Sequence, residues 1–314
     1  MRVTDQLIDA NSGHQIWSDR YDRTLDDIFA LQDEITDAIV SALEPAVGRA
    51  EMQRAQRKNP QNLDAWGFYQ KGMWHLSKVT RDDLGQANHL LREAMQTDPD
   101  FAPPHAALAF LGFLARSLSF ILDPEITPKD SYEAASRAVR LDEMDPFAHA
   151  ALGVTRTLER EYDGALASAD RAVKLNPSYA FGHHAVHIAN SMYGDHQVSL
   201  EVCRQACRIS PNDPWLFYFL TGVSGMHYML RDYEEGIKTG LAAVERYPQY
   251  ANSHRWLAMS YAQAGYLDEA KREIQIYLQL TPNALDTAKD AYPYRNQADL
   301  DHYRDGLRKA GIGV

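Results

Sequence analysis

The chain has 314 residues, of which 45% are hydrophobic and 24% are charged, and its formal net charge is -11. This composition is typical of a folded globular protein and excludes a disordered chain. The negative charge repels phosphate backbones, so we expect no nucleic-acid partner. The two cysteines, Cys203 and Cys207, are too few for a disulfide framework and predict a cytoplasmic protein.

Residues 1–25 predict a β-hairpin. The stretches RVTDQLID and HQIWSDRYD each alternate apolar and polar side chains, and ANSG between them supplies a turn. Two strands alone are marginal in water. Their exposed edges could pair with a second copy of the chain, so a homodimer is one open alternative. The opening MRVTDQLIDA lacks the apolar core of a signal peptide.

Residues 26–61 predict a linking helix, because apolar side chains recur there at three- and four-residue steps. Further on, residues 106–122 form the longest apolar stretch, with Arg116 inside it. At 17 residues with an internal charge, this stretch is better explained as a buried helix than as a membrane span. We therefore expect no membrane partner.

The following part of the chain contains a sequence repeat with a period of 34 residues. Pro177 and Pro211 are 34 residues apart, and so are Pro248 and Pro282. Proline ends each unit because it cannot continue the preceding helix. The units lie at about 146–179, 180–213, 217–250 and 251–284, the third after an inserted PWL, and two looser units lie at 62–101 and 102–145.

Small side chains recur in step with the prolines. Gly153 and Ala165 in one unit correspond to Ala258 and Ala270 in the last, where two helices must approach closely. This pattern resembles the tetratricopeptide repeat (TPR) family. The resemblance implies an all-α, TPR-type helical solenoid of about six helix pairs over residues 62–284. Within residues 285–314, a helix from Asn296 to Gly311 would cap the solenoid.

The stretch from RVTDQLID to ITDAIVSAL resembles the end of a TolB/FlgO-like domain. In bacterial regulators such a domain precedes TPRs and follows a class III adenylate/guanylate cyclase or a winged-helix domain. The resemblance implies the regulatory or sensory region of a bacterial signalling protein. The catalytic residues of a cyclase would lie in a domain that this sequence lacks, so no catalytic role carries over. The chain is then either a naturally short relative or a fragment.

Metal and cofactor chemistry is not expected. No Gly-rich phosphate loop, GxSxG or HExxH occurs in the sequence. GHHAVH places His183 and His187 at i,i+4 with His184 beside them, but a third ligand and a second shell are also needed. The two thiols likewise lack nearby partners. Packing explains the histidines better, because four occupy the fourth position of their units: His105, His149, His183 and His254.

The aromatic side chains Trp66, Trp256 and Tyr261 are expected in the core. Another set falls where this family lines its concave surface with the first helix of each unit. That set is apolar and aromatic with adaptable methionines, and it predicts a partner-binding groove unless the chain's own ends cover it. The predicted groove residues are Phe147, Val154, Phe181, His184, Ile188, Met192, Tyr218, Tyr228, Met229, Arg255 and Met259.

The groove residues also indicate the kind of partner. Arg255 is the one candidate cation at the relevant positions of the four clear units, so a carboxylate clamp is not expected. An amphipathic helix or an extended apolar peptide fits better. We therefore predict a non-catalytic protein-interaction module. The alternatives are part of a nucleotide cyclase, and a scaffold that self-assembles through the hairpin.

Overall fold

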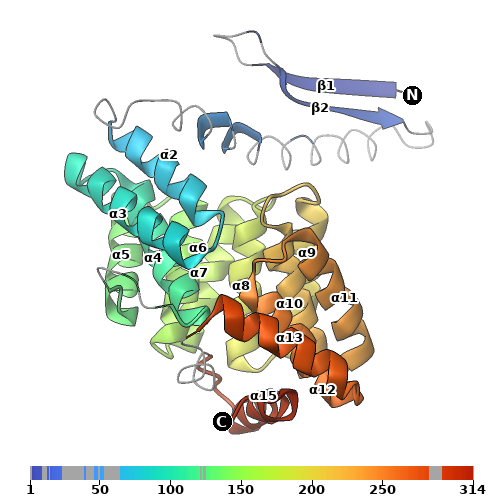
Figure 1. Ribbon diagram of the computed structural model, residues 1–314. Helices are drawn as coiled ribbons and strands as arrows, with labels where there is room; N and C mark the ends of the chain where they lie inside the picture. Colours follow the sequence, from blue (N-terminus) through green and yellow to red (C-terminus); the bar gives the residue numbers. More distant parts are fainter. Residues whose placement is uncertain are drawn as a thin grey trace.

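The computed structural model describes residues 2–8, 13, 15–22, 39, 46–48, 50–52, 64–120, 122, 125–282 and 292–313. The helices form antiparallel pairs that stack into a curved solenoid (Figure 1). The predicted all-α fold is confirmed. The first helices of the pairs are α2 (Ala65–Leu76), α4 (Ala102–Ser117), α6 (Pro146–Leu158), α8 (Ala180–Tyr193), α10 (Leu216–Met229) and α12 (Ala251–Ala264).

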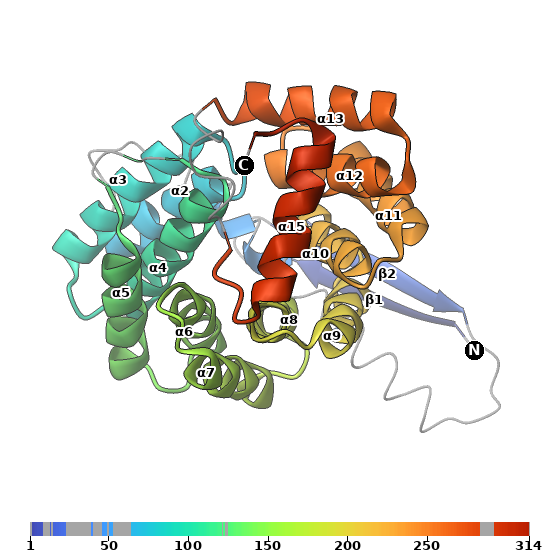
Figure 2. The same cartoon turned by 90° about the horizontal axis from the view of Figure 1, so that it is seen from below.

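The second helices form the outer layer of the solenoid (Figure 2). Each is amphipathic and buries one narrow stripe of side chains, such as Ala165, Ala169 and Ala172, whereas nearly the whole of α4 and α10 is buried. The second helices are α3 (Arg81–Thr97), α5 (Pro128–Leu141), α7 (Tyr162–Leu175), α9 (His196–Ile209), α11 (Tyr233–Arg246) and α13 (Leu267–Leu280).

Close approach within a pair depends on the small residues that define the repeat. A Cβ atom added at Gly153 would lie 3.2 Å from the Ala169 Cβ and 3.3 Å from the Ala165 carbonyl oxygen. Ala258 and Ala270 are fully buried at the equivalent places of the last pair. The physical reason that we gave for these positions is therefore confirmed.

The turns inside the pairs use left-handed backbone. Gly194 and Gly265 end α8 and α12 with φ angles of 107° and 93°. Two other pairs place an arginine in this region, with φ angles of 61° at Arg160 and 64° at Arg231. A side chain there costs roughly 1–2 kcal/mol relative to a right-handed conformation. The sequence gives no sign of these two positions because neither is a glycine.

The four fourth-position histidines do more than pack. Each Nε2–H donates a hydrogen bond to the backbone carbonyl six residues earlier, in the loop that enters the helix. This contact ties the start of each first helix to the turn before it. The distances are 3.2 Å from His105 to Pro99, 3.0 Å from His149 to Glu143, 2.7 Å from His183 to Pro177 and 2.9 Å from His254 to Pro248.

Replacing His183 by Ala should lower the free energy of unfolding by about 1 kcal/mol, the usual net contribution of such a hydrogen bond. Its partner, the Pro177 carbonyl, would lose its donor. Chemical denaturation followed by circular dichroism measures the change. The control is His89→Ala on the exposed face of α3, which should not destabilise the protein. Equal effects of the two variants would contradict a role for the His183 contact.

The predicted N-terminal hairpin is also confirmed. Strands β1 (Arg2–Ile8) and β2 (Gln15–Asp22) pair antiparallel, with Asp5 opposite Asp19 and an irregularity between Leu7 and Ile8. Most of the predicted linking helix, residues 26–61, lies outside the described residues. The described parts of it, residues 39, 46–48 and 50–52, are helical. Among the described helices, none is long and apolar enough to cross a membrane.

The C-terminal segment, residues 292–313, does not simply continue the stack. Its helix α15 (Gln297–Ala310) ends at Gly311 with a φ of 110°, as predicted. Figure 2 shows α15 inside the curve of the solenoid, across the first helices. The Arg295 N–H donates to the Met192 carbonyl at 2.9 Å, and the Tyr228 hydroxyl donates to the His302 carbonyl at 2.7 Å. The helix that we expected to cap the end therefore reaches back along the concave face.

Candidate binding groove

The eleven predicted groove residues do lie on first helices, but helix packing and the C-terminal segment cover most of them. Nine are buried, and Arg255, Tyr228 and Met259 have no exposed surface. Phe147 and Phe181 alone among the eleven are partly exposed. The sequence left open whether the chain's own end covers the predicted groove. The structure shows that it covers this part.

Arg255, the candidate cation, is enclosed by the C-terminal segment. Its guanidinium donates to the Tyr292 hydroxyl at 2.7 Å. The guanidinium carbon lies 5.0 Å from the centre of the Tyr292 ring, 5.6 Å from that of Tyr277 and 5.8 Å from that of Tyr303. These cation–π contacts compensate part of the cost of burying the charge. Arg255 is thus a core residue here, and a partner cannot reach it.

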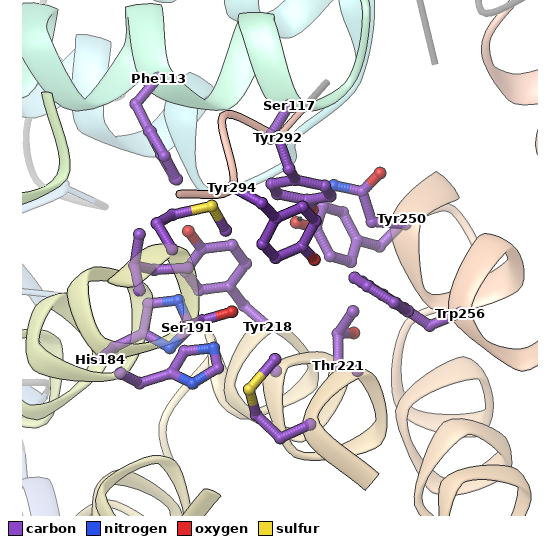
Figure 3. Close-up of a pocket in the computed structure, with 17 residues that line it drawn as sticks. Phe113, Ser117, His184, Ser191, Tyr218, Thr221, Tyr250, Trp256, Tyr292 and Tyr294 are labelled. Carbon is purple, nitrogen blue, oxygen red and sulfur yellow. Dashed lines mark hydrogen bonds between the residues drawn. The ribbon is translucent and has the colours of Figure 1, made fainter. Parts of the chain in front are cut away.

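Tyr292 and Tyr294 insert between α4 on one side and α8, α10 and α12 on the other (Figure 3). The Tyr294 hydroxyl contacts the Met229 sulfur at 3.9 Å. A small cavity of about 40 Å³ remains beneath them, against His184 and Tyr218. Burial raises the pKa of Tyr218 well above its usual range. At 5% exposure, Tyr218 belongs to the core.

The remainder of the inner face is open. A hollow of about 770 Å³ lies between α2, α4 and the starts of α6, α8 and α10, and Gly48 and Met52 also line it. We call it the N-terminal hollow. Aromatic and apolar side chains form most of its wall. They include Trp66, Tyr69, Met73, Trp74, Phe110, Met144, Phe147, Phe181 and Trp215.

The floor of the N-terminal hollow is an interlocked aromatic cluster. Phe110 meets Phe181 edge-on with ring centres 5.4 Å apart, and Phe181 meets Trp215 in the same way at 5.4 Å. Trp215 comes from the inserted PWL and is 8% exposed. Such edge-to-face pairs are worth about 0.5–1.5 kcal/mol each beyond the area that they bury. These contacts hold the floor of the hollow rigidly.

Trp66 is the clearest correction to the sequence analysis. We expected it in the core, but it is 43% exposed and lines the N-terminal hollow. Its ring rests on Tyr69 and Phe101, with ring centres 5.8 and 6.1 Å away. Trp66 lies at the start of α2, where its indole N–H donates a hydrogen bond to the Glu51 carboxylate at 3.4 Å. The i, i+3, i+7 spacing of Trp66, Tyr69 and Met73 could have revealed this face.

The charged side chains that line the N-terminal hollow are acidic. Its described lining includes Asp142, Asp145 and Asp213 and no lysine or arginine. Asp145 accepts a hydrogen bond from the Phe147 N–H at 2.8 Å, and burial raises its pKa above the usual value.

These features define a TPR-type helical solenoid with an aromatic hollow on its inner face. The fold agrees with a solved structure, "Crystal structure of APC/C hetero-tetramer Cut9-Hcn1", at a TM-score of 0.55 and 14% identity, over 84% of this chain and 46% of that one. A structure titled "Crystal structure of YrrB: a TPR protein with an unusual peptide-binding site" matches at a TM-score of 0.37 and 13% identity, over 68% and 97%. No family model matches the chain.

One curated relative has been found in Rhizobium meliloti (strain 1021), under the name "Putative adenylate cyclase 3". It is 28% identical over 169 residues, which is 52% of this chain. The match covers 28% of the relative, so the chain spans well under two thirds of that protein's length.

Proposed function

We propose that this chain is a protein-interaction module that binds a partner segment in the N-terminal hollow. The observation that carries the proposal is the hollow of about 770 Å³ described above, which is lined largely by aromatic side chains. Rigid aromatic side chains in a concave site are the usual source of binding energy at protein interfaces. Phe147 and Phe181 of the predicted groove belong to this surface.

The partner that fits is an amphipathic peptide or helix with large apolar side chains and flanking lysines or arginines. Its apolar side chains would fill the space between Trp66 and Phe181, and its cations would face Asp142 and Asp145. The net charge of -11 would speed the approach of such a segment. An acidic segment would be repelled, which makes the choice of partner testable.

The signalling context is part of the same proposal. The name of the R. meliloti relative and its greater length support a regulatory region within a nucleotide-cyclase type of protein. In that context the present chain is cytoplasmic and non-catalytic, and acts by holding a partner or another domain. Incubation of the purified chain with ATP or GTP and Mg²⁺ should yield no cyclic nucleotide. Measurable turnover would overturn this assignment.

Replacing Trp66 by Ala should weaken peptide binding about tenfold, as expected for an aromatic anchor at an interface. The probe is a short fluorescein-labelled peptide with Leu and Trp on one helical face and Lys on the other, followed by fluorescence anisotropy. A second peptide carrying Glu in place of Lys should bind much more weakly. The control is Tyr266→Ala, because Tyr266 is 46% exposed, similar to Trp66, and lies outside the hollow.

Two results would contradict the proposal. If neither peptide binds, the hollow does not recognise an amphipathic segment. If Trp66→Ala and Tyr266→Ala weaken binding equally, the peptide adheres to exposed aromatic side chains in general and not to this site.

A further inference from the structure

Three metal-binding side chains meet in the core between α8, α9 and α10. His184 and His187 come from α8 and Cys203 from α9, and one ligand atom from each lies within 4.8 Å of the other two. Their exposures are 2%, 2% and 0%. From the sequence we expected no metal here, because neither the histidines nor the thiols have further ligands nearby along the chain. The crossing of α8 and α9 supplies a third ligand.

A hydrogen bond fixes the proton of His187. The Ser199 hydroxyl donates to the His187 carbonyl at 2.8 Å, so its oxygen must accept the hydrogen bond that joins it to His187 Nδ1, also at 2.8 Å. His187 therefore carries its proton on Nδ1 and has a free lone pair on Nε2. Metal-binding histidines are commonly held in this way by a second-shell partner.

Gly222 of α10 leaves room in front of that lone pair. A Cβ atom at this position would lie 2.7 Å from His187 Nε2 and 2.8 Å from Cys203 Sγ. The imidazole nitrogen and the thiol thus both face Gly222, where any larger side chain would collide with them. Bond lengths to zinc are about 2.0–2.1 Å for nitrogen and 2.3 Å for sulfur, so an ion that joins the two groups would lie between them, beside the Gly222 backbone.

His184 provides the third potential ligand. Its Nδ1 lies 4.0 Å from Cys203 Sγ, and its Nε2 is buried without a hydrogen-bond partner. His184 and His187 also line the cavity of about 40 Å³ beneath the C-terminal segment (Figure 3). A cavity of that size can hold a water molecule, which a fourth coordination position would use.

A neutral imidazole is the form that binds a metal. In the absence of an ion, Cys203 donates a hydrogen bond to the Phe219 carbonyl at 3.2 Å.

We propose that His184, His187 and Cys203 form a buried Zn²⁺ site whose fourth position opens to the cavity. Nitrogen and thiolate ligands select zinc over magnesium or calcium. Binding breaks the Cys203 S–H bond, forms a Zn–S bond and releases one proton to solvent. Tetrahedral zinc sets its ligand atoms about 3.4–3.6 Å apart, so the three side chains would close by about 1 Å. The ion would join α8 to α9.

The test uses the full chain, stripped with a chelator, incubated with Zn²⁺ and desalted. We expect about one zinc per chain, the stoichiometry of a single site. Cys203→Ser and His187→Gln should each lose the bound metal. Matched controls are Cys207→Ser on the same helix and His183→Gln on the same helix as His187, and both should keep it. Wild-type retention in Cys203→Ser, or equal loss in Cys207→Ser, would overturn the proposal.

Cobalt gives a second readout that does not depend on a variant folding. With Co²⁺, the wild-type chain should show a thiolate-to-cobalt charge-transfer band together with the visible bands of tetrahedral cobalt. Absence of the charge-transfer band in the wild-type chain would overturn the site, because it would mean that Cys203 is not a ligand.

Discussion

Replacing Tyr303 by Ala should lower the free energy of unfolding by about 3–5 kcal/mol, the usual cost of removing a buried aromatic side chain. Tyr303 is fully buried on α15. Its ring centre lies 5.6 Å from those of Trp256 and Tyr292. Loss of the ring removes the aromatic contacts that Tyr303 makes with Trp256, Tyr292 and Tyr294. Urea denaturation followed by circular dichroism measures the effect.

The same variant should also expose apolar surface, because α10 and α12 lose part of their cover. Binding of an environment-sensitive dye should therefore rise under native conditions. The control, Tyr266→Ala, removes a tyrosine that is 46% exposed and should change neither quantity appreciably. A loss of stability below about 1 kcal/mol, the range of ordinary surface substitutions, would show that α15 contributes little to holding the fold.

Substituting Gly306 by Ala should destabilise the protein by about 1–3 kcal/mol, the cost of overfilling a packed site. The added methyl group on α15 would overlap the Tyr228 hydroxyl and lie 2.8 Å from Tyr228 Cζ. Tyr228 cannot easily move, because it is fully buried, its hydroxyl donates to the His302 carbonyl, and its ring stacks on His302 at 4.6 Å.

Gly85→Ala provides a control for which we expect the opposite effect on stability. Gly85 lies inside α3, and an added Cβ would meet no atom within 4 Å. Gly85→Ala should therefore stabilise the protein by about 0.5–1 kcal/mol through helix propensity alone. Both variants can be compared by thermal denaturation. A stabilising Gly306→Ala would mean that α15 is not seated against Tyr228.

Much of the solenoid could be predicted from the sequence because its signals are local. The spacing of Pro177 and Pro211, the small side chain at Gly153 and the turn at Gly194 each act within one unit. A repeat protein stacks similar units, so each local sequence signal occurs several times along the chain. The start and the stop of α15 followed from the same kind of signal.

The path of the C-terminal segment could not be predicted in this way. Tyr292 and Tyr294 lie in AYPYRNQ, which has no helical or strand periodicity, and their partners are on α8, α10 and α12. Long-range packing decides such contacts. The exposure of Trp66 was missed for a related reason, since it also depends on long-range packing. The approach of Cys203 to His187 also depends on how two helices cross.

The concave face is therefore divided into two parts. The part around Arg255 is filled by the C-terminal segment, and the part around Trp66 and Phe181 is open. Our central claim is that a partner uses the open part while the C-terminal segment stays in place. A partner that displaced α15 would instead reach the whole predicted groove, including Met229 and Met259.

Hydrogen–deuterium exchange with and without the Lys-bearing peptide tests this claim most directly. We predict slower exchange in residues 65–77 and 142–147, which border the N-terminal hollow, and unchanged exchange in residues 297–310. Faster exchange in residues 297–310 on peptide binding, with no protection in residues 65–77, would contradict the account, because it would show that the peptide displaces α15 and occupies the groove that α15 covers.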